Sequence, residues 1–271
     1  MASMRFRIRC KEGIVTTSDL SGAFRDWQYN NEHWLFISPH DDDIVVGGGL
    51  LLQGAAAENV RVTILIATDG SMGYCRRSDR KKIVSIRKEE TINSFHQLSI
   101  GDIRWLGFRD SDLYRYAGRR RAANGDPAVV EGHTGLQNAF THAIRSIRPT
   151  RIFVPGRTDF HPDHKLVYQE VLISVFHAQG AIWPELGEPL CSIPAVYEMA
   201  IYSPFEGPPD IRIEGESEQL DRKIDGIRAY ASQKQIEAII ERQKNGGPVE
   251  YLRDIHYELY SPEMYDELFG L

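Results

Sequence analysis

The sequence predicts a single α/β domain, residues 1–271, in which a mostly parallel sheet carries helices on both faces. Apolar runs of strand length alternate along the chain with longer stretches of helical spacing. Strands that alternate with helices in this way form βαβ units, whose strands pair in parallel. A length of 271 residues and a hydrophobic content of 42% suit one folded core of this size. The expected arrangement is therefore Rossmann-like.

The first half of the chain supplies four strands and two helices to this prediction. Arg alternates with apolar residues at 5–10, which indicates a short strand. Trp-Leu-Phe-Ile-Ser at 34–38 reads as a buried strand that Pro39 stops, because proline cannot donate to a sheet ladder. The remaining elements expected here are strands at 60–67 and 103–107 and helices at 47–58 and 82–98.

The second half continues the alternation. Helical spacing at 136–147 ends at Arg148, because the residue before Pro149 is disfavoured in the helical conformation. The other expected elements are strands at 151–155 and 196–202 and helices at 163–177 and 219–242. Residues 112–134 show no clear period and include three consecutive arginines. A loop this long inside a compact domain predicts a lid over the substrate or an insertion.

Composition excludes several classes of function. A net charge of -6 gives no electrostatic footprint for nucleic acid. The longest apolar stretch, 44–57, is too short to cross a bilayer, so no transmembrane segment is expected. Cys10, Cys75 and Cys191 are far apart and form no CxxC pair, which argues against disulfides and against a cysteine metal site. Reduced thiols favour a cytoplasmic location.

Two clusters of acidic residues and histidines follow directly after predicted buried strands. His40, Asp42 and Asp43 come after the strand at 34–38, and His161 and His164 follow the strand at 151–155. In an open α/β sheet, ligands bind beyond the carboxyl ends of the strands. We therefore expect the two clusters to form one site.

Metal chemistry suits these residue types. A catalytic zinc takes imidazole nitrogens and carboxylate oxygens as three protein ligands and keeps a fourth position open. Two histidines and one carboxylate satisfy that count, and the remaining acidic and histidine side chains become catalytic candidates. The alternative is that Asp41, Asp42 and Asp43 form a solvated turn or a helix N-cap, with His161 and His164 on the surface.

The same residues carry a resemblance to a known family. Pro39-His40-Asp41-Asp42-Asp43, paired with His161-Pro162-Asp163-His164, resembles the PIG-L/LmbE-like family of zinc-dependent N-acetylglucosamine deacetylases. Weaker matches run through most of the chain, at Thr68-Asp69-Gly70, Arg87-Lys88-Glu89-Glu90, Leu106-Gly107-Phe108-Arg109-Asp110 and Ser232-Gln233. The resemblance implies a hydrolase that removes the acetyl group from a small-molecule N-acetyl amino sugar conjugate.

The resemblance also implies a role for each residue of the motifs. His40, Asp43 and His164 would hold Zn²⁺, and Asp42 would be the general base. His161 would stabilise the oxyanion or protonate the leaving amine, with Asp163 as its electrostatic partner. Arg87 and Asp110 would contact sugar hydroxyls. The chain departs from the family pattern at Asp41, where the family usually has Pro, and at Ile44, where it usually has Glu.

Three other functions fit parts of the sequence. His40-x-Asp42 with a distant His also matches the facial triad of non-haem Fe(II) oxygenases. The oxygenases with this sequence pattern, however, usually have all-β folds. Gly47-Gly48-Gly49 after a strand suggests nucleotide binding, but the spacing is not GxGxxG. A non-catalytic metal- or sugar-binding protein would keep the ligands and show no activity on N-acetyl sugars.

Overall fold

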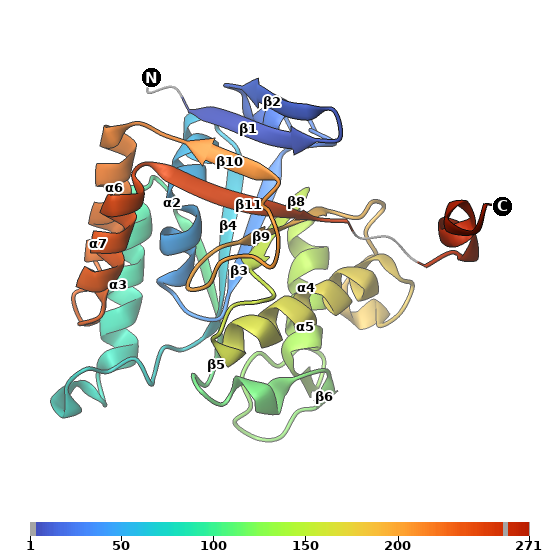
Figure 1. Ribbon diagram of the computed structural model, residues 1–271. Coiled ribbons are helices and arrows are strands. Elements are labelled where there is room, and N and C mark those ends of the chain that lie inside the picture. The colour runs from blue at the N-terminus through green and yellow to red at the C-terminus, as the bar shows by residue number, and fades with distance from the viewer. Residues whose placement is uncertain (1–3, 257–259, 271) are drawn as a thin grey trace.

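The computed structural model describes residues 4–256 and 260–270. Its centre is a nine-stranded sheet, formed in chain order by β1 (Arg5–Cys10), β2 (Gly13–Thr17), β3 (His33–Ser38), β4 (Arg61–Thr68), β5 (Asp102–Phe108), β8 (Arg151–Pro155), β9 (Ala195–Met199), β10 (Ile211–Glu214) and β11 (Val249–Ile255). The strand order across the sheet is β2-β1-β10-β11-β9-β8-β3-β4-β5. Figure 1 shows the helices arranged on either side of these strands.

The sheet consists of a parallel part and an antiparallel part. Strands β5, β4, β3, β8 and β9 pair in parallel, as the alternation of strands and helices predicts. Strands β11, β10, β1 and β2 extend this sheet by antiparallel pairing. The sequence analysis predicted only β1 of these four and missed β2, β10 and β11. Strand β2 is largely exposed, and charged residues interrupt the apolar ones in both β10 and β11. None of the three carries the apolar run that identifies a buried strand.

Helices cover both faces of the sheet, which confirms the α/β class. They are α1 (Leu20–Ala23), α2 (Asp43–Ala57), α3 (Ile83–Gln97), α4 (Leu136–Ile147), α5 (Pro162–Gln179), α6 (Ser217–Arg228) and α7 (Ile236–Gly246). One apolar core lies under α2, α3, α6 and α7, and a second lies under α4 and α5 on the opposite face (Figure 1). Short 3-10 turns occupy Arg77–Asp79, Leu113–Tyr116, Pro184–Leu186 and Pro262–Phe269.

Two predicted helices have different bounds in the structure. The helix expected at 219–242 is divided into α6 and α7, because the chain between them turns inward at Tyr230 and Ser232. The Tyr230 hydroxyl donates to the carbonyl of Asp41 at 2.6 Å, and the backbone N–H of Ser232 donates to Glu90 at 2.7 Å. Helix α2 begins at Asp43, four residues earlier than predicted. Both differences bring the chain toward the acidic cluster.

Residues 112–134 are folded against the helices α4 and α5 rather than lying free. They include a small hairpin of β6 (Arg120–Arg121) and β7 (His133–Thr134). The N–H of Gly118 donates to Glu170 on α5 at 2.7 Å, and the guanidinium of Arg119 stacks 4.6 Å from the ring centre of Trp183. Local ion pairs such as Arg120–Asp126 explain why a polar segment without periodicity can be ordered.

Two expectations about composition can be compared with this fold. Cys10, Cys75 and Cys191 are all exposed and unpaired, as their spacing predicts. Within the part of the chain that the structure describes, no helix has both the length and the apolar character that crossing a membrane requires.

Candidate functional site

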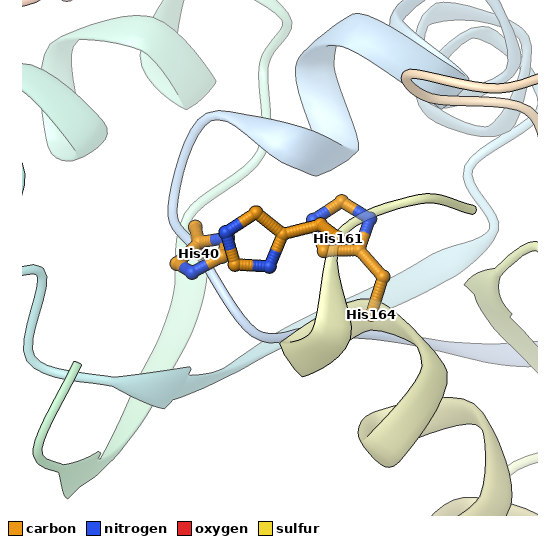
Figure 2. Close-up of side chains that lie close together, drawn as sticks. All are labelled: His40, His161 and His164. Atoms are coloured by element: carbon orange, nitrogen blue, oxygen red, sulfur yellow. The ribbon is translucent and has the colours of Figure 1, made fainter. Parts of the chain in front are cut away.

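The two acid/histidine clusters meet at the carboxyl ends of neighbouring parallel strands, as predicted. His40 follows β3, and His161 and His164 lie at the start of α5, just after β8. The ring centres are 4.7 Å apart for His40 and His161, 5.5 Å for His40 and His164, and 5.1 Å for His161 and His164. Figure 2 shows these imidazoles converging from the two segments. The β3–β8 pairing brings together residues that are more than a hundred positions apart in the chain.

Asp43 lies between two of the histidines. Its side chain is fully buried, with Oδ2 3.3 Å from Nδ1 of His40 and Oδ1 3.2 Å from Nε2 of His164. The backbone N–H of His40 donates to Oδ2 at 2.9 Å and fixes the carboxylate. Burial works to raise the pKa of Asp43, but attraction to His164 and His40 holds this pKa below its ordinary value. The carboxylate is therefore an anion held within reach of two imidazoles.

The arrangement of these atoms fits a metal ion better than a set of hydrogen bonds. Asp43 Oδ1 and Nε2 of His164 are buried without a hydrogen-bond partner, although they are only 3.2 Å apart. Orphaned buried polar atoms are costly unless something else satisfies them. Ligands about 2.0–2.1 Å from a tetrahedral zinc lie about 3.3–3.4 Å from one another. The spacings of 3.2 and 3.3 Å around Asp43 are close to that edge length.

The structure brings a third histidine close to the same point. Ligand atoms of His40, His161 and His164 all lie within 4.8 Å of one another, and those of His40, Asp110 and Asp163 form a second such group. The set expected from the resemblance has Asp43 in place of His161. Asp43 contacts both His40 and His164, whereas His161 is only half-buried and lines the cavity. The ligand set that includes Asp43 stays a prediction.

Asp42 lines the cavity beside His40. Its carboxylate is buried, and burial together with the neighbouring charge of Asp43 raises its pKa. Asp42 Oδ1 lies 3.3 Å from Nη2 of Arg87. A carboxylate in this position, at the cavity and next to Asp43, suits a general base.

Arg87 lines the cavity as expected, but much of its hydrogen-bonding capacity is used inside the protein. Its guanidinium makes a two-point ion pair with Asp41, with Nε 3.0 Å from Oδ2 and Nη2 contacting Oδ1. Thr91 donates to the same carboxylate at 3.2 Å. The Asp that replaces the usual Pro is therefore buried and paired, which contradicts its alternative reading as a solvated turn. Arg87 is thus almost completely buried but still contributes to the lining of the cavity.

Asp110 and Asp163 both point toward His40. Oδ1 of Asp110 and Oδ2 of Asp163 each lie 3.5 Å from Nε2 of His40, and Asp110 also accepts the backbone N–H of Met72 at 3.1 Å. Asp163 was expected to be the electrostatic partner of His161, and its charge does work to raise the pKa of that imidazole, although burial and the charges of His40 and His164 hold this pKa below its ordinary value. The backbone N–H of Asp163 also donates to Nδ1 of His161 at 3.2 Å. Both carboxylates can orient the His40 ring, and Asp110 also lines the cavity.

Two further residues of the site were missed by the sequence analysis. Asp159 accepts the N–H groups of His161 and Tyr202 at 3.0 and 3.1 Å, and its Oδ2 lies 3.2 Å from Nδ1 of His164. A carboxylate behind a ligand histidine is the usual orienting partner at metal sites. The ring of Tyr202 stacks on His164 with centres 5.1 Å apart. An acid two residues before His161 is a weak signal in the sequence, and Tyr202 gives none.

A cavity of about 350 Å³ opens above these side chains. Its lining includes His40, Asp42, Arg87, Asp110, His161 and Tyr202, with Met72, Gly73, Ser111, Phe160, Gln233, Gln235 and Ile239. None of the residues 112–134 belongs to this lining. Ser111, directly before the segment, does line the cavity, while ion pairs within the segment and its contact with α5 order the segment itself. Its role as a lid or an insertion stays a prediction.

Comparison with known proteins places the fold and the motifs in context. A probable N-acetyl-alpha-D-glucosaminyl L-malate deacetylase 2 of Bacillus subtilis is 28% identical over 229 residues, which cover 80% of this chain and 91% of that protein. The fold resembles N,N'-diacetylchitobiose deacetylase of Pyrococcus horikoshii, with a TM-score of 0.68, 22% identity and coverage of 91% of this chain and 88% of that one.

The same fold also occurs in an enzyme with a different reaction. The 4-carboxy-2-hydroxymuconate hydratase of Pseudomonas putida aligns with a TM-score of 0.65 at 18% identity, covering 85% of this chain and 99% of that one. Fold alone therefore does not identify the activity. The sequence does identify the family, since the PIG-L family, described as GlcNAc-PI de-N-acetylase, matches residues 35–175, which contain both acid/histidine motifs. This chain belongs to the PIG-L family.

Proposed function

We propose that the protein is a zinc-dependent deacetylase that hydrolyses the N-acetyl amide of an N-acetylglucosamine-type conjugate and releases acetate and a free amine. One observation carries the proposal. The buried carboxylate of Asp43 lies between His40 and His164 with unpartnered atoms, directly beneath a cavity that Asp42 and His161 face. This set contains the donors for one divalent metal, a general base and a general acid.

The side chains divide the chemistry among them. A divalent metal held by His40, Asp43 and His164 would polarise the amide carbonyl and lower the pKa of water at the site. Asp42 takes a proton from the attacking water, because its raised pKa makes it a better base than an ordinary carboxylate. His161, on the cavity side, gives a proton to the nitrogen of the breaking C–N bond. Without that proton the amine is a poor leaving group.

The substrate class rests on the relatives and on the cavity. Curated relatives are named as deacetylases of an N-acetylglucosaminyl malate and of an inositol 2-acetamido-2-deoxyglucopyranoside. These substrates share the acetylated amino sugar and differ in the group attached to it. A volume of about 350 Å³ lies near the lower end of the range for small-molecule pockets, which suits one sugar ring. Arg87 and Asp110 lie where they can contact its hydroxyls.

The α/β fold argues against the oxygenase alternative, since oxygenases with the His-x-Asp facial triad usually have all-β folds.

The deacetylase proposal is tested by measuring acetate release from a panel of N-acetylglucosamine glycosides. We expect turnover that is abolished by a chelator and restored by one equivalent of Zn²⁺. Protein that binds zinc but releases no acetate from any member of the panel would instead support a non-catalytic binding protein.

A further inference from the structure

A second cavity lies beside the one that contains the metal site. It has a volume of about 370 Å³ and shares three lining residues with the first cavity, namely Phe160, Tyr202 and Ile239. Its remaining walls come from the start of α2, the segment after β9, helix α7 and strand β11. The proposed function does not use this cavity. Its position allows a molecule with its sugar over the metal site to extend past the shared residues into it.

Phe160 is an exposed aromatic side chain held in a fixed place between the two cavities. It is 67% exposed, although it directly precedes His161. Its backbone N–H donates to Oγ of Ser203 at 3.1 Å, and the neighbouring Thr158 donates to the carbonyl of Pro204 at 3.1 Å. Together with the bond from the Tyr202 N–H to Asp159, these contacts tie the two loops together. These bonds fix the backbone at Phe160 so that its exposed side chain borders both cavities.

The aromatic ring of Phe160 continues a row of rings that starts at the metal site. Tyr202 stacks on His164 with an interplanar angle of 29°, and Phe160 lies against Tyr202 with ring centres 5.7 Å apart and planes tilted by 31°. The row leads from His164 to the boundary of the second cavity. Its exposed end is Phe160, whose ring is available to a group that passes from one cavity to the other.

The walls of the second cavity are largely apolar. Residues such as Val46, Ile201, Pro204 and Tyr251 supply most of the lining. Glu250 also lines it, but this carboxylate is already occupied by Lys223 Nζ at 2.6 Å and by two backbone N–H groups. The other charged side chain in this lining is Arg242, which is exposed. The lining therefore favours an apolar group over a polar one.

We propose that this cavity is a second subsite, which binds an apolar aglycone, aromatic or aliphatic, attached to the N-acetylated sugar. The inference rests on the proposed function and narrows its substrate class. The sugar lies over the metal site, Phe160 stacks on the first atoms of the attached group, and the wall formed by Ile201 and Tyr251 encloses the rest. Substrates with a small aglycone lose these contacts and bind more weakly.

The test compares the methyl and phenyl glycosides of N-acetylglucosamine, in both anomeric forms, by acetate release from the zinc-loaded protein. We expect the phenyl glycoside to have a KM about tenfold lower than the methyl glycoside, because the ring is removed from water. Phe160→Ala and Tyr251→Ala should each reduce this ratio severalfold. Phe176→Ala is the matched control, because this phenylalanine on α5 is 40% exposed and lies outside both cavities.

The outcomes separate the subsite from the proposed function. Equal KM values for the two glycosides in the unmodified protein, with acetate released from both, would overturn the subsite and leave the deacetylase standing. No acetate from either glycoside would overturn the deacetylase. A preference for a carboxylate-bearing glycoside that Arg242→Ala abolishes, with Phe160→Ala having no effect, would show that the cavity selects charge and would overturn the apolar assignment.

Discussion

Two clusters of buried charged side chains contact helix α2, and they differ in how many of their polar atoms have hydrogen-bond partners. At its start, Asp43 contacts His40 and His164, but its Oδ1 has no hydrogen-bond partner, and neither has Nε2 of His164. In its middle, Glu250 of β11 accepts Lys223 Nζ at 2.6 Å and the N–H groups of Leu50 and Leu51 at 2.8 and 3.0 Å. Both carboxylates are almost completely buried.

The second cluster explains an irregularity in α2. Gly48 has non-helical backbone angles, φ −140° and ψ 19°, so the helix is kinked and its second part has a new N-terminus. The carboxylate of Glu250 caps that terminus, where free N–H groups and the helix dipole favour an anion. The three donors to Glu250, which are Lys223 Nζ and the N–H groups of Leu50 and Leu51, all belong to the protein itself. This cluster therefore contributes to stability, while the unsatisfied cluster at Asp43 is arranged for a ligand that the fold does not supply.

The largest expected effect is loss of bound metal from the unsatisfied cluster. Purified protein should hold about one zinc ion per chain, and Asp43→Ala and His164→Ala should each abolish binding in equilibrium dialysis, because three protein ligands are the minimum for such a site. His161→Ala should retain the metal. His142→Ala, a histidine on α4 far from the site, serves as the control. Retention by Asp43→Ala with loss by His161→Ala would assign the ligand set to the three histidines instead.

The next effect concerns catalysis without loss of metal. Asp42→Asn keeps the size of the side chain and removes its basicity, so kcat should fall by roughly two to four orders of magnitude. Zinc content should not change, and the free energy of unfolding should stay the same or rise, because the repulsion between Asp42 and Asp43 is relieved. A variant that loses its zinc together with its activity would show that Asp42 is a ligand.

The smallest expected effect lies in the satisfied cluster and appears in stability. Glu250→Gln leaves the Lys223 charge buried without its counterion, which should lower the free energy of unfolding by about 3 kcal/mol in denaturant titrations. Metal binding should remain. Glu218→Gln, which breaks an exposed pair with Arg222, should cost less than about 1 kcal/mol. Equal losses of unfolding free energy for the two variants would contradict the view that the buried pair contributes more to stability than the exposed pair.

Much of the site could be predicted from short-range patterns. The strand at 34–38 is stopped by Pro39, and its carboxyl end lies at the edge of the sheet next to His40. The strand at 151–155 ends at the same edge, shortly before His161 and His164. The rule that parallel strands present their carboxyl ends at one edge was enough to join the two motifs. The two missed residues could not be found in this way. Tyr202 reaches His164 from the segment after β9, and Asp159 acts through contacts that no local spacing predicts.

The sequence by itself determined the α/β alternation, the two motifs and their meeting, because these depend on local apolar patterns and on the direction of parallel strands. Only the tertiary structure decided how the charges are paired. Asp41 meets Arg87 across 46 positions of the chain, and Glu250 reaches the kink of α2 across 200. Such pairs depend on which segments pack against one another in three dimensions. Tertiary packing also decided that residues 112–134 fold against α5 and that Phe160 stands between two cavities.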